Sequence, residues 1–183
     1  SFFALQPNMT VVEVLPGRGW YTAILAPYLA KGGGKLYAAS YDPLTATDDQ
    51  LATLTEFKSR FLKNPATFGA IELTVLSAKS DAIAPPNSAD LVLAANVTNG
   101  IMAEGYPEKA FAAFFAALKP GGILGVEQHR ARSSGLQDPQ AGTGYVQEEY
   151  VKLLAKEAGF EFVGSSEINA NPKDTRDHPF GVW

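Results

Sequence analysis

Two glycines, Gly17 and Gly19, lie in a short break between an apolar, strand-like run and a helical pattern. Glycine at such a break lets the backbone approach a ligand closely. The helix that follows presents unpaired N–H groups and a partial positive charge at its N-terminus. A nucleotide phosphate or an amino-acid carboxylate would suit this position. An ordinary strand-to-helix turn also explains the two glycines, because a loop with two glycines is weak evidence on its own.

His129 is the candidate general base of the chain. It ends a strand-like run in the segment Glu127-Gln128-His129-Arg130, and an imidazole can accept or release a proton near neutral pH. A structural imidazole, hydrogen-bonded under the following loop, is the alternative interpretation. Glu127 is either a buried, satisfied polar group or a group that binds substrate, and the sequence leaves both open.

Three further segments could contact a substrate. The amide of Asn96 and its neighbours could hold a substrate, although asparagine in a loop is more commonly a turn former. Trp20 and Tyr21 could stack on a flat molecule, but aromatic residues at the start of a helix more often belong to the core. The polar segment 169–178 is either a lid over the substrate or a surface loop with salt bridges. It holds only two adjacent metal-ligand residues, so we predict no metal site.

Short apolar runs alternate with longer helical patterns along the chain. We expect strands at 10–15, 35–40, 71–76, 90–95, 123–128 and 160–168, and helices at 20–30, 48–63, 107–118 and 147–158. Pro27 should kink or shorten the first helix, and residues 119–122 should form a turn. Such alternation predicts the α/β fold class: a Rossmann-like, doubly wound, mostly parallel sheet with helices on both faces. Ligands of such sheets bind at the carboxyl ends of the strands.

Composition narrows the class of protein. The 183 residues fit one domain, 1–183, and a start at Ser1 without methionine suggests a longer protein truncated at both ends. The net charge of −4, without a basic cluster, argues against a nucleic-acid partner. No apolar run is long enough to predict a membrane span. The chain has no cysteine, so disulfides and thiol nucleophiles are excluded.

The segments VVEVLPGRGWYT, GKLYAASYDP, SADLVLAANV, ALKPGG and EEYVKLLAKEAGFEFV occur in an order that resembles the class I S-adenosylmethionine-dependent methyltransferases. More narrowly, GWYTAILAPYLA and EINANPKDTRDHP resemble a family of bacterial predicted methyltransferases, many of which have export signals. The resemblance covers essentially the whole chain. It implies S-adenosylmethionine as cofactor and a location that is either periplasmic, as in that family, or cytoplasmic.

The resemblance also implies roles for individual residues. Glu13 corresponds to the acidic residue that orients the methionine end of the cofactor. Gly17 and Gly19 correspond to the glycines that wrap its methionine and ribose. Asp81 corresponds to the residue after the third strand that meets the adenine amine, with Ala82 beside it.

Two positions depart from the pattern of that family. Leu15 stands where the family has the first glycine of its loop, so a side chain occupies a place where the cofactor usually approaches the backbone. Ser40 stands where an acid grips both ribose hydroxyls, and one hydroxyl cannot replace a carboxylate that accepts two hydrogen bonds. Asp42 could take over the ribose contact, but it also begins an Asp-Pro turn.

We therefore expect a methyltransferase that acts on a small molecule, with Asn96 facing the methyl group and His129 as the base. Methyl transfer mainly requires alignment of two partners, and a base is needed only if the acceptor must lose a proton. The alternative is a binding or regulatory module that kept the fold and lost catalysis, as Leu15 and Ser40 would permit. A nicotinamide-dependent oxidoreductase fits poorly, because its glycine pattern would need a small residue at Thr22.

Overall fold

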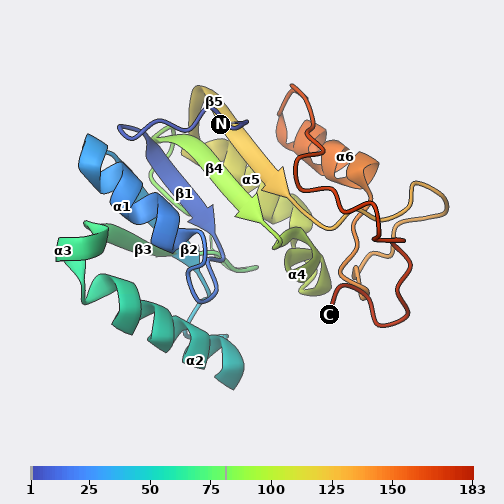
Figure 1. Cartoon of the computed structure of the whole chain (residues 1–183), viewed down its shortest axis with the longest axis horizontal. Coiled ribbons are helices and arrows are strands. Elements are labelled where there is room, and N and C mark those ends of the chain that lie inside the picture. Colours follow the sequence, from blue (N-terminus) through green and yellow to red (C-terminus); the bar gives the residue numbers. More distant parts are fainter. Residues whose placement is uncertain (1, 81) are drawn as a thin grey trace.

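A single parallel sheet forms the centre of the molecule in a computed structural model, which describes residues 2–80 and 82–183 (Figure 1). Its strands lie in the order β3-β2-β1-β4-β5, and every neighbouring pair is parallel. The strands are β1 (Thr10–Val14), β2 (Lys35–Ser40), β3 (Ile71–Val75), β4 (Ala89–Ala95) and β5 (Leu118–Glu127). The predicted Rossmann-like α/β class is thus confirmed.

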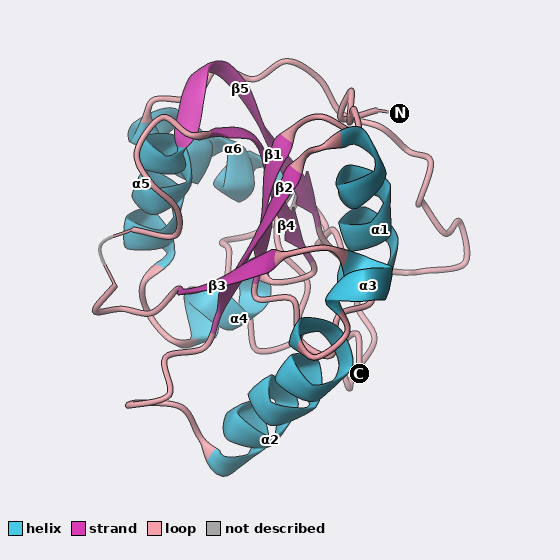
Figure 2. Cartoon of the chain, turned by 90° about the vertical axis from the view of Figure 1, so that its left-hand side faces the viewer, coloured by secondary structure: helices cyan, strands magenta, loops and turns pink. Residues whose placement is uncertain are grey.

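Helices cover both faces of this sheet (Figure 2). One face carries α1 (Thr22–Gly32), α2 (Asp48–Phe57), a π-helical turn η1 (Lys58–Leu62) and α3 (Pro65–Phe68). The other face carries α4 (Thr98–Ala103), α5 (Pro107–Ala117) and α6 (Glu148–Ala158). The sheet is therefore doubly wound, as predicted. No helix among the described residues is long and apolar enough to cross a membrane.

Strand alternation sets which side chains of β1 face each layer. Val12 and Val14 pack into the core cluster beneath α5, whereas Val11 packs against α1. Glu13 therefore points to the α1 face, between apolar neighbours, and only 3% of its surface is exposed. Regular strand geometry alone places one carboxylate under the start of α1.

The helix boundaries follow local signals with two exceptions. Thr47 and Gln50 form a reciprocal capping box at the start of α2, and Gly33 ends α1 with a φ of 75°. Pro27 does not end α1, which continues to Gly32. The helix predicted over 48–63 is α helical only to Phe57 and then becomes η1.

The predicted strand over 160–168 is wrong. Among the described residues, no strand follows β5, and Val163 and Ile168 are almost fully exposed. The apolar pattern of this segment signals β propensity, but a strand also needs a partner edge, and nothing in the described chain pairs with it. The predicted turn at 119–122 is a bulge within β5, where the pairing with β4 shifts between Ala89 and Leu91.

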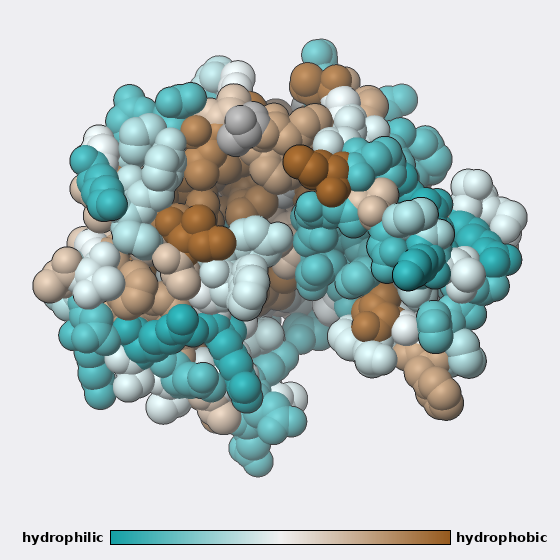
Figure 3. Space-filling view, in the orientation of Figure 1, coloured by the Kyte–Doolittle hydropathy of each residue, from teal (hydrophilic) through white to brown (hydrophobic). Residues whose placement is uncertain are grey.

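The face shown in Figure 3 has hydrophobic residues in its hollowed middle and hydrophilic residues around most of its rim. Single exposed apolar side chains are ordinary on a globular surface. The position of the hollow in the fold matters more for function than its composition.

Candidate functional site

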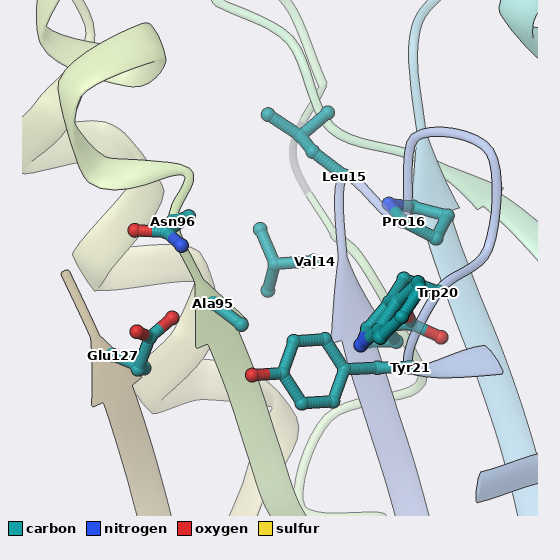
Figure 4. Close-up of a pocket in the computed structure, with 9 residues that line it drawn as sticks. Val14, Leu15, Pro16, Trp20, Tyr21, Ala95, Asn96 and Glu127 are labelled. Atoms are coloured by element: carbon teal, nitrogen blue, oxygen red, sulfur yellow. The ribbon is translucent and has the colours of Figure 1, made fainter. Parts of the chain in front are cut away.

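A cavity of about 300 Å³ lies at the carboxyl ends of β1, β4 and β5 (Figure 4). It is lined by Glu13, Val14, Leu15, Pro16, Trp20, Tyr21, Ala95, Asn96 and Glu127. Its volume is at the low end of the roughly 300–1,000 Å³ that small-molecule pockets occupy. It would thus hold a group of amino-acid size together with part of a second molecule.

The position of this cavity in the sheet identifies it as the candidate site. The chain leaves β1 toward α1 on one face and leaves β4 toward α4 on the other, so the connections diverge between these two neighbouring strands. Ligands of open α/β sheets bind at such a switch point. A second cavity of about 630 Å³ lies at the opposite edge, beside the starts of β2 and β3. It is larger, but the topology gives it no comparable reason to bind a ligand.

Glu13 is the buried charged group of the site. Thr22, which is fully buried at the start of α1, donates a hydrogen bond from Oγ1 to Glu13 Oε2 at 2.6 Å. Burial raises the pKa of Glu13 from 4.5 to about 7, against the lowering effect of hydrogen bonds from the Thr22 hydroxyl and backbone. A carboxylate this desolvated favours a cation beside it, because an opposite charge would lower its pKa again.

Gly17 and Gly19 have different surroundings, which explain in different ways why each position holds a glycine. Both have positive φ, 55° at Gly17 and 81° at Gly19. A Cβ at Gly19 would clash with the buried ring of Phe61, so packing against η1 explains this glycine without a ligand. A Cβ at Gly17 would meet nothing within 4 Å, so the chain there faces open space. Neither glycine is in the cavity lining, and of the two only Gly17 has open space beside it, so its contact with a cofactor stays a prediction.

Leu15 and Asn96 occupy matching places on neighbouring strands. Each directly follows its strand, β1 or β4, and each has a positive φ, 45° for Leu15 and 53° for Asn96. Their N–H groups donate to the carbonyl oxygens of Ala39 and Glu127 at 2.7 Å, which continues each sheet ladder by one bond. Asparagine adopts this conformation more readily than leucine. The backbone at Leu15 thus has the conformation that a glycine would favour.

Trp20 and Tyr21 form the aromatic side of the cavity. Trp20 is 79% exposed, so the interpretation of Trp20 as a core residue is wrong. Tyr21 is half-buried, and Figure 4 shows its ring extending toward the end of β4, with Ala95 and Glu127 beyond it. Burial and the negative charges of Glu127 and Glu13 raise the pKa of Tyr21. Its phenol therefore stays neutral and faces two carboxylates.

Several predicted site residues lie outside the cavity lining. The predicted ribose ligands are among them: Ser40 is buried at the end of β2, and Asp42 accepts the Leu44 N–H at 2.9 Å in a turn. Ala82 is exposed away from the cavity, and Asp81 lies outside the described residues. The cavity brings together Glu13, Leu15 and Asn96 with the residues beside Gly17, but it does not reach the ends of β2 and β3.

His129 also stands apart from the cavity lining. Its side chain is exposed and its ring meets Tyr145 edge to face, with 6.2 Å between the ring centroids. The Tyr145 hydroxyl donates to Asp174 Oδ1 at 2.8 Å. This geometry ties His129 to the C-terminal segment. Its role as a base remains a prediction that the geometry does not support.

The segment 169–178 is joined to the loop after β5 by a salt bridge and a hydrogen bond. Arg132 pairs with Asp177 at 2.6 Å, and Arg132 Nε also donates to the Thr175 carbonyl. This arrangement matches the interpretation as a salt-bridged surface loop. Among the described residues, no group of three or more histidine, aspartate or glutamate side chains is placed to hold a metal ion.

Sequence reasoning missed Thr22 and underrated Tyr21. A hydroxyl residue at the first helical position after a glycine loop, facing an acid in the preceding strand, is a recognisable signal for Thr22. Sequence reasoning also did not identify Gln128, whose side chain links the end of β5 to α4. Its amide donates to Asn99 Oδ1 at 3.1 Å and accepts the Thr98 N–H, so the side chain of Asn99 is engaged within the protein.

No protein-family model and no curated protein matches the sequence. Solved structures with a similar fold include a SAM-dependent methyltransferase from Aquifex aeolicus, at 22% identity and a TM-score of 0.61, with 90% of this chain and 78% of that one covered. A SAM-dependent methyltransferase from Methanosarcina mazei has 15% identity and a TM-score of 0.61, with 87% and 83% covered.

A possible exported protein from Bordetella parapertussis is 21% identical, with a TM-score of 0.57. The match covers 86% of this chain, which spans only 57% of the length of that protein. At these identities the likeness concerns the course of the backbone. The chain has the α/β fold found in S-adenosylmethionine-dependent methyltransferases.

Proposed function

We propose that the chain is an S-adenosylmethionine-dependent methyltransferase that acts on a small molecule. The observation that carries the proposal is the buried Glu13 carboxylate in the switch-point cavity. S-adenosylmethionine has an ammonium group and a sulfonium centre in its methionine part, and both are cations. A desolvated carboxylate at the bottom of a small cavity is suited to that end of the molecule.

The residues present fit the cofactor at its methionine end. Glu13 would hold the cationic group, and Gly17 would let the loop backbone lie against the ligand, because no atom fills the space around it. The first N–H groups of α1 are engaged within the protein, since that of Thr22 donates to Glu13 and that of Ala23 to the Gly19 carbonyl, so the helix would favour the cofactor carboxylate only through its partial positive charge. Ser40 stands where the methyltransferase family has the acidic residue that binds the ribose hydroxyls. We therefore expect the methionine end of the cofactor to provide most of the recognition.

When bound, S-adenosylmethionine would supply an activated methyl group, because its positively charged sulfur becomes a good leaving group, a neutral thioether, when the methyl group passes to an acceptor. The protein then has to hold the acceptor in line with that methyl group. Asn96 lies at the tip of β4 with its side chain at the cavity, where it can position either partner. The cavity is small and half-enclosed by aromatic side chains, which favours an acceptor of low molecular mass.

Calorimetric titration of the protein with S-adenosylmethionine, S-adenosylhomocysteine and NADH tests the proposal. We expect micromolar binding of the first two and none of NADH. Absence of heat and of any thermal shift with both sulfur compounds would refute the proposal. It would favour the alternative from the sequence, a module that kept the fold and lost its cofactor.

A further inference from the structure

Glu127 contains a buried oxygen without a partner. Among the residues that the structure describes, two buried side-chain oxygens have no hydrogen-bond partner, Thr98 Oγ1 and Glu127 Oε2. Glu127 ends β5 and lines the cavity, whereas Thr98 is the first residue of α4 and is not in the cavity lining. Buried polar atoms are nearly always paired in native proteins, so an unpaired carboxylate oxygen at a cavity indicates a position where a ligand donates.

The surroundings of Glu127 favour a cationic donor. Glu127 and Glu13 are both in the cavity lining, which contains no lysine, arginine or histidine. Register places Glu127 beside Ala95, on the α1 face of the sheet and two strands from Glu13. The methionine end of the cofactor can compensate for Glu13, but Glu127 lies on the far side of β4 and needs a charge of its own.

The aromatic side chains support the same conclusion. The ring of Tyr21 extends toward Glu127, and the indole of Trp20 is exposed beside the cavity. Tryptophan and tyrosine faces attract ammonium groups. The Tyr21 ring lies between Glu127 and Trp20, so an amine held by Glu127 would lie next to an aromatic wall of the cavity.

We propose that Glu127 binds the methyl acceptor and that this acceptor is a small molecule with a basic amine, the ammonium group of which donates to Glu127 Oε2. This inference rests on the proposed methyltransferase function and specifies the substrate class of the same site.

Methyl transfer to such an amine requires a free lone pair on its nitrogen. The bound ammonium gives one proton to the Glu127 carboxylate, which frees the lone pair of its nitrogen. The nitrogen forms a bond to the methyl carbon while the carbon–sulfur bond breaks and its electron pair goes to sulfur. The products are a methylammonium, a thioether and one proton, which leaves Glu127 for solvent. No oxidant or further reactant is needed.

Binding of two probes of opposite charge tests the inference without a turnover assay. The full chain, with and without saturating S-adenosylhomocysteine, is titrated with 2-phenylethylamine and with 3-phenylpropionate, which carry a ring on a short chain and differ in charge. We expect the amine to bind at least about tenfold more tightly than the carboxylate. We expect Glu127→Gln to weaken the amine about tenfold or more, because it removes a charged hydrogen-bond acceptor. Glu161→Gln, at an exposed position in the C-terminal segment, is the matched control and should bind as the wild type does.

Equal or tighter binding of the carboxylate, no binding of the amine, or unchanged amine affinity in Glu127→Gln would each overturn the inference. If that variant does not fold, the preference of the wild type between the two probes still decides. Retained binding of S-adenosylhomocysteine with failure of the amine would refute only the acceptor class. Failure of S-adenosylhomocysteine itself would refute the proposed function.

Discussion

Glu13 Oε2 and Thr22 Oγ1 lie 2.6 Å apart in a hydrogen bond that links the middle of the sheet to the first turn of α1. Both residues are buried, and the bond is too weak to offset the desolvation of the carboxylate, whose pKa is raised to about 7. A group with this pKa changes its charge within the physiological range. Glu13 therefore links stability to pH and, under the proposed function, links cofactor binding to pH as well.

Stability should fall as pH rises through the range in which Glu13 ionises. The folded pKa of about 7 exceeds the ordinary 4.5, so between these values the folded state binds more protons than the unfolded state. The free energy of unfolding thus falls from about pH 4.5 to pH 7 and is level above. The full change is roughly 3 kcal/mol. The Glu13→Gln variant should lack this pH-dependent change in the free energy of unfolding. Urea unfolding near pH 5 and near pH 8 measures it, and Glu56→Gln, at an exposed position, is the control. Parallel pH curves for wild type and Glu13→Gln would contradict the assignment.

Cofactor binding should tighten as pH rises toward neutrality. A cation beside Glu13 lowers the pKa of this carboxyl, so binding releases a proton wherever free Glu13 is protonated. The affinity for S-adenosylmethionine should rise about fivefold from near pH 6 to near pH 7, where an α-amino group is still mostly protonated. Titration in two buffers of different ionisation enthalpy measures the released proton directly. A dissociation constant that does not change with pH would show that Glu13 does not contact the cation. So would a pH dependence of the dissociation constant that is the same in Glu13→Gln as in the wild type.

The two loop glycines should respond differently to alanine. Gly19→Ala forces a Cβ into the Phe61 ring and should cost about 3 kcal/mol of stability, from overpacking and from the positive φ. Gly17→Ala meets no atom and should cost only about 1 kcal/mol, yet it should weaken S-adenosylhomocysteine binding. Gly121→Ala is the matched control, because it has a φ of 80° and open space but lies at the start of β5. Equal binding by Gly17→Ala and Gly121→Ala would count against the loop as a cofactor site.

Leu15 should tolerate glycine better than alanine. At a φ of 45° alanine has a steric cost of about 1–2 kcal/mol that glycine avoids, whereas glycine loses about 0.5–1 kcal/mol in chain entropy. Leu15→Gly should therefore be at least as stable as Leu15→Ala. At Val14, inside β1, the same comparison should favour alanine. Chemical denaturation of the four variants tests this, and a more stable Leu15→Ala would show that the backbone there is not strained.

The sheet could be predicted because its signals are local. The run from Thr10 to Leu15 is apolar except for Glu13, and in a strand buried on both faces that exception marks a functional or paired carboxylate. The same pattern gave the positions of β1, β2, β3 and β4 to within a residue or so. The role of Glu13 came from the resemblance to the methyltransferases, whereas Asn96 was identified because it directly follows a strand that ends at the ligand-binding edge of the sheet.

The features of the fold and of the site that were not predicted depend on tertiary contacts, which a local sequence pattern does not reveal. The segment 160–168 has strand-like composition, but no edge pairs with it among the described residues. Trp20 follows the glycine loop directly, and only the direction in which the chain leaves Gly19 makes it exposed rather than buried. Position 19 requires a glycine because the Phe61 ring packs against it. Phe61 is more than forty positions away in the chain, so a single sequence does not reveal this contact. The position of His129 likewise depends on Tyr145 and the C-terminal segment.

A crystal structure of the complex with S-adenosylhomocysteine would show where the cofactor binds. We expect the amino-acid end of the ligand in the cavity at the ends of β1 and β4, with a ligand atom in contact with the Glu13 carboxylate and the backbone of Gly17 against the ligand. Density at the second cavity, beside the starts of β2 and β3, would contradict it. So would a ligand that leaves Glu13 without a contact.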